Sequence, residues 1–272
     1  MDFTRFMNDA AALEKTLRLL QGLAQLAASV LAADHHLVLV AGALRKHFAL
    51  GRRYFRYFKW LDCALAAADA MPGRGSESEV GGKEGVETLL IAARASFLGM
   101  YLLLEACTIL HVMGVHKSSW APTFHVEGMR FWFYSLCCSI VLSVHELHTS
   151  SKASTNATCN GTTTITAAAA PPKKKTKTKS HNKATQEPKP SPTTTAAAAP
   201  PSHLTQAHLR ARHTHALRTL LISALDLLTP GAIVGWIPAA PSVVAATSIA
   251  SSFLGAQDIW RRVNAANSAG AG

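Results

Sequence analysis

The sequence is poor in charged residues, and this scarcity already excludes one class of protein. Only 16% of its 272 residues are charged, whereas 49% are hydrophobic. A mainly disordered chain has the opposite balance, so most of this chain is expected to fold around apolar contacts. The twelve prolines are clustered along the chain and exclude a single continuous helical rod.

Cysteine is also scarce, and its spacing excludes a disulfide-stabilised scaffold. The chain has five cysteines, an odd number, and none of them forms a CxxC pair. This usage is typical of a reducing compartment. The opening residues lack the basic and apolar regions of a secretory signal peptide, so the sequons at Asn156 and Asn160 are expected to be unused.

No catalytic or metal-binding motif is complete. Residues 81–83 end like a phosphate-binding loop, but Glu77 replaces its first glycine and Glu84 its Ser/Thr. His145 and His148 are three residues apart, not the four of a zinc hydrolase helix, and GxSxG is absent. We therefore predict a protein that is not an enzyme, with no catalytic residue, no metal site and no cofactor.

Acidic residues are few, and the resulting positive charge is concentrated in one segment. The chain has 27 Lys and Arg against 16 Asp and Glu, a net charge of +11, and residues 150–203 alone contribute +7. This segment consists mainly of Thr, Ala, Pro and Lys, and we predict a disordered linker. A nuclear-localisation or nucleic-acid patch is the alternative for its lysines. No aromatic residue there can stack on bases, so we expect no nucleic-acid partner.

Two helices are predicted near the N-terminus. Apolar residues recur at helical spacing over 9–33, with Asn8 or Asp9 as the cap and Asp34 at the break. In the second helix, 37–65, six cations fall within an arc of about 140° at ~100° per residue, opposite an aromatic-rich face. Such a helix lies in the interface of an anionic membrane; the alternative is a soluble-bundle helix with a hydrated basic face. The predicted membrane-binding residues are Arg45, Lys46, Phe48, Arg52, Arg53, Tyr54, Phe55, Arg56, Phe58 and Lys59.

Three further apolar runs follow. We expect residues 88–116 to form a buried or membrane-surface helix, because Arg94 and Glu105 interrupt it. Residues 131–144 carry no charge but are short for a span of about 20 residues; with the flanking Gly128 and Met129 they could form a first transmembrane segment. Residues 227–257 are the strongest membrane signal, and their prolines allow either a re-entrant hairpin or a kinked span.

A short motif within the last run admits two interpretations. Gly231 and Gly235 form a GxxxG, which we predict to be a helix-contact face. Beside Pro230, however, the same glycines can serve only a turn.

Three segments together resemble the peroxisomal biogenesis factor 11 family, the membrane-elongation peroxins. They are residues 14–21, the basic-aromatic block 50–59, and a C-terminal pair, 225–230 and 255–261. Their order and spacing match the family, and the length is most similar to its gamma-type fungal branch. The 150–203 insertion departs from the family pattern.

The resemblance implies an integral protein of the peroxisomal membrane. Family members insert an amphipathic helix into the cytosolic leaflet, elongate the membrane, self-associate and help to recruit the fission machinery with its dynamin-like GTPase. We therefore expect an anionic phospholipid membrane, a homo-oligomer and this machinery as partners. The resemblance also implies two spans with both termini in the cytosol, which would place the linker in the matrix. The inserting role transfers to Arg45, Arg52, Arg53, Phe55, Arg56, Phe58 and Lys59.

The predicted fold is all-α, a membrane-associated helical bundle with a C-terminal hydrophobic hairpin or span. Its parts are residues 1–149, the linker 150–203, a C-terminal membrane region 204–264 and a flexible tail 265–272. The alternative function is a pore or channel component for small solutes. It is motivated by Arg94, Glu105 and Asp226, since ionisable groups within apolar runs often line pathways.

Overall fold

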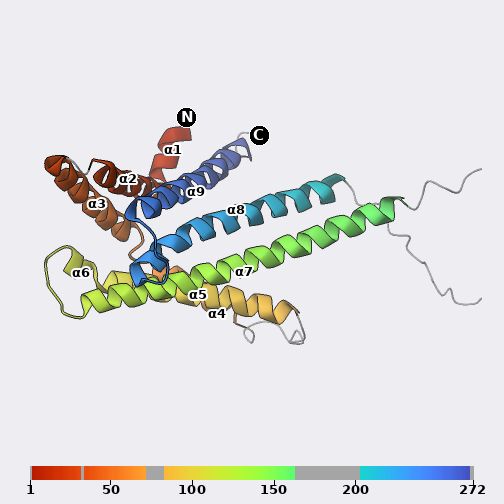
Figure 1. Cartoon of the computed structure of the whole chain (residues 1–272). Helices are drawn as coiled ribbons and strands as arrows, with labels where there is room; N and C mark the ends of the chain where they lie inside the picture. Colours follow the sequence, from red (N-terminus) through yellow and green to blue (C-terminus); the bar gives the residue numbers. More distant parts are fainter. Residues whose placement is uncertain (1, 32–33, 72–82, 163–202, 270–272) are drawn as a thin grey trace, which may run out of the picture. The chain divides into compact units, whose positions relative to one another are not determined.

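The computed structural model describes residues 2–31, 34–71, 83–162 and 203–269, and every regular element in these ranges is a helix. The predicted all-α fold is confirmed (Figure 1). The helices are α1 Asp2–Asn8, α2 Ala10–Val30, α3 His35–Phe55, α4 Lys59–Asp69, α5 Lys83–Cys107, α6 Ile109–Val112, α7 Ala121–Thr162, α8 His203–Val234 and α9 Pro241–Ala269.

Aspartates begin the first two long helices. The Asp9 carboxylate accepts hydrogen bonds from the backbone N–H groups of Ala11 and Ala12, at 2.8 and 3.2 Å. Asp34 caps α3 in the same way, accepting from His36 and Leu37 at 3.0 and 3.2 Å. Each cap satisfies N–H groups that lack a partner within the helix and contributes about 1 kcal/mol.

The predicted helix 37–65 is wrong as one continuous element. Helix α3 ends at Phe55 and α4 begins at Lys59, with a short turn between them. Arg56, which follows the last residue of α3, has a non-helical backbone (φ −118°, ψ 15°). Its guanidinium is bound to α5 through Glu105, so the chain turns where this side chain is anchored.

Helix α2 packs between α3 and α9, and small residues allow the close approach to α9 (Figure 1). A Cβ added at Gly22 would lie 2.8 Å from Cγ1 of Ile249 and 3.5 Å from the carbonyl oxygen of Ala245. Ser251 and Ser252 on α9 are fully buried. These contacts hold the N-terminal and C-terminal helices together as one layer.

A second group of contacts joins α4, α5 and α7. A Cβ added at Gly99 of α5 would lie 3.3 Å from Cβ of Cys63 on α4, so the two helices pack closely at this glycine. The Tyr101 ring stacks on Trp132 of α7 with centroids 5.2 Å apart. Further along, the His145 imidazole of α7 lies 3.9 Å from the Glu87 carboxylate of α5. The part of helix α7 up to His145 therefore runs antiparallel to α5.

The end of α8 shows what Gly231 and Gly235 do. Gly235 has φ +85°, a conformation that favours glycine, and the N–H of Trp236 donates to the Gly231 carbonyl at 2.9 Å. The nearest atoms to a Cβ added at Gly231 all belong to Ile237, at 2.5 Å and beyond. Within the described residues, the two glycines therefore lie at a helix end, and their predicted contact with another helix stays a prediction.

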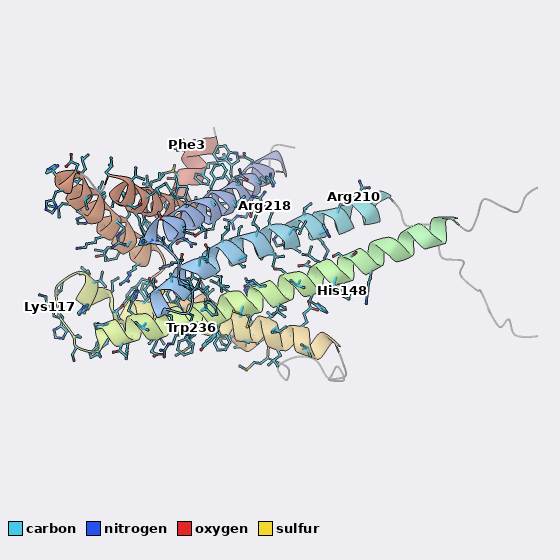
Figure 2. The ribbon with its side chains drawn as sticks, in the orientation of Figure 1. Phe3, Lys117, His148, Arg210, Arg218 and Trp236 are labelled. Carbon is cyan, nitrogen blue, oxygen red and sulfur yellow. The ribbon has the colours of Figure 1, made fainter. Side chains whose placement is uncertain are left out.

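Helices α8 and α9 form the predicted C-terminal hairpin. After the turn at Gly235, the Arg218 guanidinium of α8 reaches α9, where it contacts the Asp258 carboxylate at 3.0 Å and donates to the Leu254 carbonyl at 3.0 Å. Figure 2 labels Arg218 and, at the end of α8, Trp236, whose ring packs 5.0 Å from that of Phe133 on α7.

Helix α7 extends into the segment predicted to be a disordered linker. It continues to Thr162, so residues 150–162 are helical, and residues 163–202 lie outside the described part of the chain. Residues 150–162 contain no proline, and an established helix adds residues at little cost. Likewise α9 continues to Ala269, into the predicted tail. The chain divides into two compact units, one of residues 1–147 with 214–272 and one of residues 148–213.

Within the described residues, two stretches are long and apolar enough to cross a membrane, Gly85–Cys107 and Arg210–Val234. The first overlaps the run 88–116: α5 begins earlier than that run and provides 23 residues of suitable composition, and the expectation of a buried or membrane-surface helix stays a prediction. The second lies mostly before the run 227–257, which the turn at Gly235 interrupts. Residues 131–144 form the middle of α7.

Candidate functional site

Helix α3 has a cationic side and an aromatic side, and their orientation is the main feature of the site. Arg52 is only 8% exposed, and the Arg53 and Arg56 side chains are also largely buried. By contrast, Phe58, just beyond the helix, is 68% exposed. The three arginines thus point into the protein, and the aromatic side faces outward.

Arg52 joins α3 to α2. Its Nε donates to Oε1 of Glu14 at 3.1 Å, and its Nη1 donates to Oε1 of Gln21 at 2.8 Å. Because these groups are buried, each hydrogen bond to a charged group is stronger than a neutral one and strongly directional. The pair fixes the rotation of α3 about its axis, with the arginines inside.

Arg53 and Arg56 join the same end of α3 to α5. Arg56 Nη2 donates to the Tyr101 hydroxyl at 2.8 Å and to Oε1 of Glu105, and its guanidinium lies 5.5 Å from the Tyr101 ring centroid. Arg53 Nε lies 3.4 Å from the same Glu105 oxygen. One carboxylate therefore serves two buried guanidinium groups.

A second buried ion pair connects α2 to α8. Arg18 and Asp226 form a two-pronged pair, with Nη1 donating to Oδ2 at 2.9 Å and Nη2 to Oδ1. The Arg18 guanidinium also lies 5.6 Å from the Trp132 ring centroid. The side chains of Arg18 and Asp226 are only 5% and 9% exposed. Removing either partner alone would leave an uncompensated buried charge and would strongly destabilise the fold.

Sequence reasoning missed these pairings, although a signal for them was present. Glu14 and Arg18 lie in the first segment of the family resemblance, Arg52 lies in the second and Asp226 in the third. Both Glu14–Arg52 and Arg18–Asp226 thus join two resemblance segments. Isolated opposite charges within apolar helices are expected to find one another, because a buried charge requires a partner.

The buried charges shift one another's ionisation. Burial alone would raise the pKa of Glu14, but Arg52, Lys15 and Arg56 outweigh it and hold that pKa well below its usual range. Burial, with the neighbouring Arg56, lowers the pKa of Arg52 to about 10. For Arg56, burial is outweighed by Glu105 and Tyr101, and the pKa is raised. Glu14, Arg52 and Arg56 are therefore charged at neutral pH.

The ten predicted membrane-binding residues divide into two groups. Arg52, Arg53 and Arg56 are inside, and Phe48 is half-buried. The other six are exposed: Arg45, Lys46, Tyr54, Phe55, Phe58 and Lys59. Of the residues that motivated a pore, Glu105 and Asp226 are buried in ion pairs, whereas Arg94 is exposed.

All-helical structure over the described residues, two apolar stretches of membrane-spanning length, buried ion pairs and an exposed group of aromatic side chains are together typical of a membrane protein. A comparison with models of protein families identifies the particular family. The family model described as Peroxisomal biogenesis factor 11 (PEX11) matches residues 1–260. The chain belongs to this family. No curated protein and no solved structure matches it.

Membership places the protein in the peroxisomal membrane and gives it a role in peroxisome biogenesis. The two apolar stretches, Gly85–Cys107 and Arg210–Val234, fit this location. Over the described part of the chain, no three His, Cys, Asp or Glu side chains are close enough to hold a metal ion. The gamma-type branch stays a prediction.

Proposed function

We propose that the protein elongates the peroxisomal membrane, and so promotes fission and proliferation, by inserting the aromatic side chains at the junction of α3 and α4 into one leaflet. The carrying observation is an exposed group, hereafter the aromatic junction, formed by Tyr54, Phe55, Tyr57 and Phe58. Aromatic side chains that expose this much apolar surface to water mark an interaction site.

The position of the aromatic junction, beside the end of the apolar stretch of α5, supports insertion at the headgroup boundary. Arg56 lies within it and contacts Glu105, two residues before Cys107, where the apolar stretch of α5 ends. If α5 crosses the bilayer, the junction lies where the hydrocarbon gives way to headgroups. Aromatic side chains are enriched at this depth, and burying them there expands one leaflet.

Exposed cations near the aromatic junction supply the attraction to anionic lipid. Arg45, Lys46 and Lys59 are exposed, and each contributes about 1 kcal/mol near an anionic surface. The three exposed cations together thus contribute at most about 3 kcal/mol to membrane binding at low salt, which is half of what six exposed cations would contribute. Aromatic insertion therefore carries a larger share of binding than the sequence pattern predicts.

Partners beyond the lipid belong to the same proposal and rest on family resemblance. Self-association would concentrate wedges on one membrane region and raise its curvature. Recruitment of the fission machinery, including a dynamin-like GTPase, would then divide the elongated membrane. A membrane-elongating protein without such recruitment would produce tubules but few new peroxisomes.

The test uses the full-length protein on vesicles of phosphatidylcholine and phosphatidylserine. Tyr54→Ser combined with Phe58→Ser is expected to weaken vesicle binding at least tenfold and to abolish tubulation, because burying an aromatic side chain contributes about 1.5–3 kcal/mol. Phe3→Ser is the matched control: Phe3, labelled on α1 in Figure 2, is 67% exposed, and Phe58 is 68% exposed. Tubulation that survives in the double variant, or is lost equally in the control, would refute the mechanism.

A further inference from the structure

A cavity of about 180 Å³ lies among α2, α3, α5, α7, α8 and α9, within the unit formed by residues 1–147 and 214–272. Four arginines line it, Arg18, Arg52, Arg53 and Arg56, together with Tyr101, Glu105, His125, Trp132 and Thr229. We call it the arginine cavity. A single water requires about 10–15 Å³ by a comparable measure, so the arginine cavity is large enough for a phosphate group.

The charges around the arginine cavity do not balance. Arg18 is matched by Asp226, and Arg52 by Glu14. Arg53 and Arg56 share the single carboxylate of Glu105. One guanidinium charge is therefore left over in a region screened from water, where an additional anion would be strongly favoured.

Unused hydrogen-bond donors accompany this excess charge. Nη1 of Arg53, Nε of Arg56 and Oγ1 of Thr229 are buried and have no hydrogen-bond partner among the described residues. All three side chains line the arginine cavity. A buried donor without a partner costs about 1–3 kcal/mol, and a ligand with several acceptor oxygens would remove this cost.

The position of the arginine cavity relates it to the membrane surface. Glu105 lies near the end of the apolar stretch of α5, and Ile233, also in the lining, lies near the end of that of α8. Both helices end at the cavity. If they cross the bilayer, the cavity lies at the depth of the lipid phosphates.

We propose that the arginine cavity binds a phosphate group, which either a phospholipid headgroup or a free phosphate compound can supply. The guanidinium donors of Arg53 and Arg56 and the Thr229 hydroxyl receive its oxygens. The bound phosphate neutralises the excess cation and ties α3 to α5 and α8. The arginine cavity lies behind the aromatic junction: Arg56 stands between the exposed aromatic residues in the sequence, but its guanidinium lines the cavity.

The test measures the melting temperature of the purified full-length protein in a neutral detergent. It is titrated with inorganic phosphate, with phosphatidic acid in mixed micelles, and with chloride at matched ionic strength. A saturable rise with phosphate or phosphatidic acid, but not with chloride, is expected, because a ligand of the folded state stabilises it. Saturation by phosphatidic acid alone assigns the site to a lipid headgroup, and saturation by both shows that free phosphate is also accepted.

Two variants decide whether the arginine cavity is responsible. Arg53→Gln is expected to weaken the apparent affinity roughly tenfold, since it removes a charged donor, while Arg261→Gln, an exposed arginine of α9 outside the cavity lining, leaves it unchanged. Thr229→Val removes a hydroxyl without a partner, so it is expected to fold normally and to bind phosphate more weakly. A rise equal to that in chloride, or a response that neither Arg53→Gln nor Thr229→Val reduces, would overturn the proposal.

Discussion

Removing Asp226 alone is expected to destabilise the protein severely. The Asp226→Leu variant leaves the Arg18 guanidinium without a partner, and that side chain is only 5% exposed. An uncompensated buried charge costs about 3–5 kcal/mol. For a chain of this size, each kcal/mol lowers the melting temperature by about 2–4 °C. The expected loss is therefore roughly 6–20 °C.

The double variant Arg18→Met with Asp226→Leu separates this explanation from a simple packing defect. Replacing both members of a buried pair with apolar side chains of similar volume is often neutral or stabilising. The double variant is therefore expected to recover most of the lost melting temperature. A matched control is Glu127→Gln, which breaks the exposed pair with Arg130 (2.7 Å) and should cost at most about 1 kcal/mol.

The assay is thermal unfolding of the purified protein in one detergent, followed by circular dichroism at fixed protein concentration. The reasoning fails if Asp226→Leu melts within a degree or two of the unmodified chain. It also fails if the double variant is as unstable as the single one, because the pair would then not be the cause of the loss.

Three further predictions concern pH, packing and surface charge. Glu14→Gln is expected to lower the melting temperature at neutral pH, and its difference from the unmodified chain should shrink as pH falls below the ordinary pKa of 4.5, because the stability from a depressed carboxyl pKa is lost on acidification. Gly22→Val should cost about 1–3 kcal/mol through overpacking against α9, whereas Gly42→Val, with nothing described within 4 Å of its Cβ position, should not destabilise. Arg45→Gln with Lys46→Gln should weaken binding to anionic vesicles by about 2 kcal/mol at low salt and leave the melting temperature unchanged.

Helix periodicity placed six cations on one face, but the structure divides them: Arg52, Arg53 and Arg56 lie inside, whereas Arg45, Lys46 and Lys59 are exposed. Six cations on one side of a helix usually indicate contact with water or lipid headgroups. Here Arg52 and Arg56 are instead partnered by Glu14 and Glu105 on other helices. Pairing between helices depends on tertiary structure, so the local pattern could not determine the direction of the face.

Motifs were least informative where the local backbone decided the outcome. GxxxG is a spacing, and the same spacing occurs where Gly235 adopts φ +85° to end a helix. Gly22 and Gly99, which do bring helices together, stand in no such motif and are recognisable only by the atoms beside them. Caps were easier to predict, because the Asp9 side chain bonds to residues directly after it.

The central claim is that the aromatic junction lies in lipid while the arginines behind it do not. It is tested most directly by an environment-sensitive fluorophore attached at Phe58→Cys in a full-length chain whose native cysteines are replaced by alanine. On anionic vesicles, the account predicts a blue-shifted emission that is quenched by lipids carrying a quencher in the upper acyl chain. Emission that stays typical of water and is quenched only by aqueous iodide would contradict it.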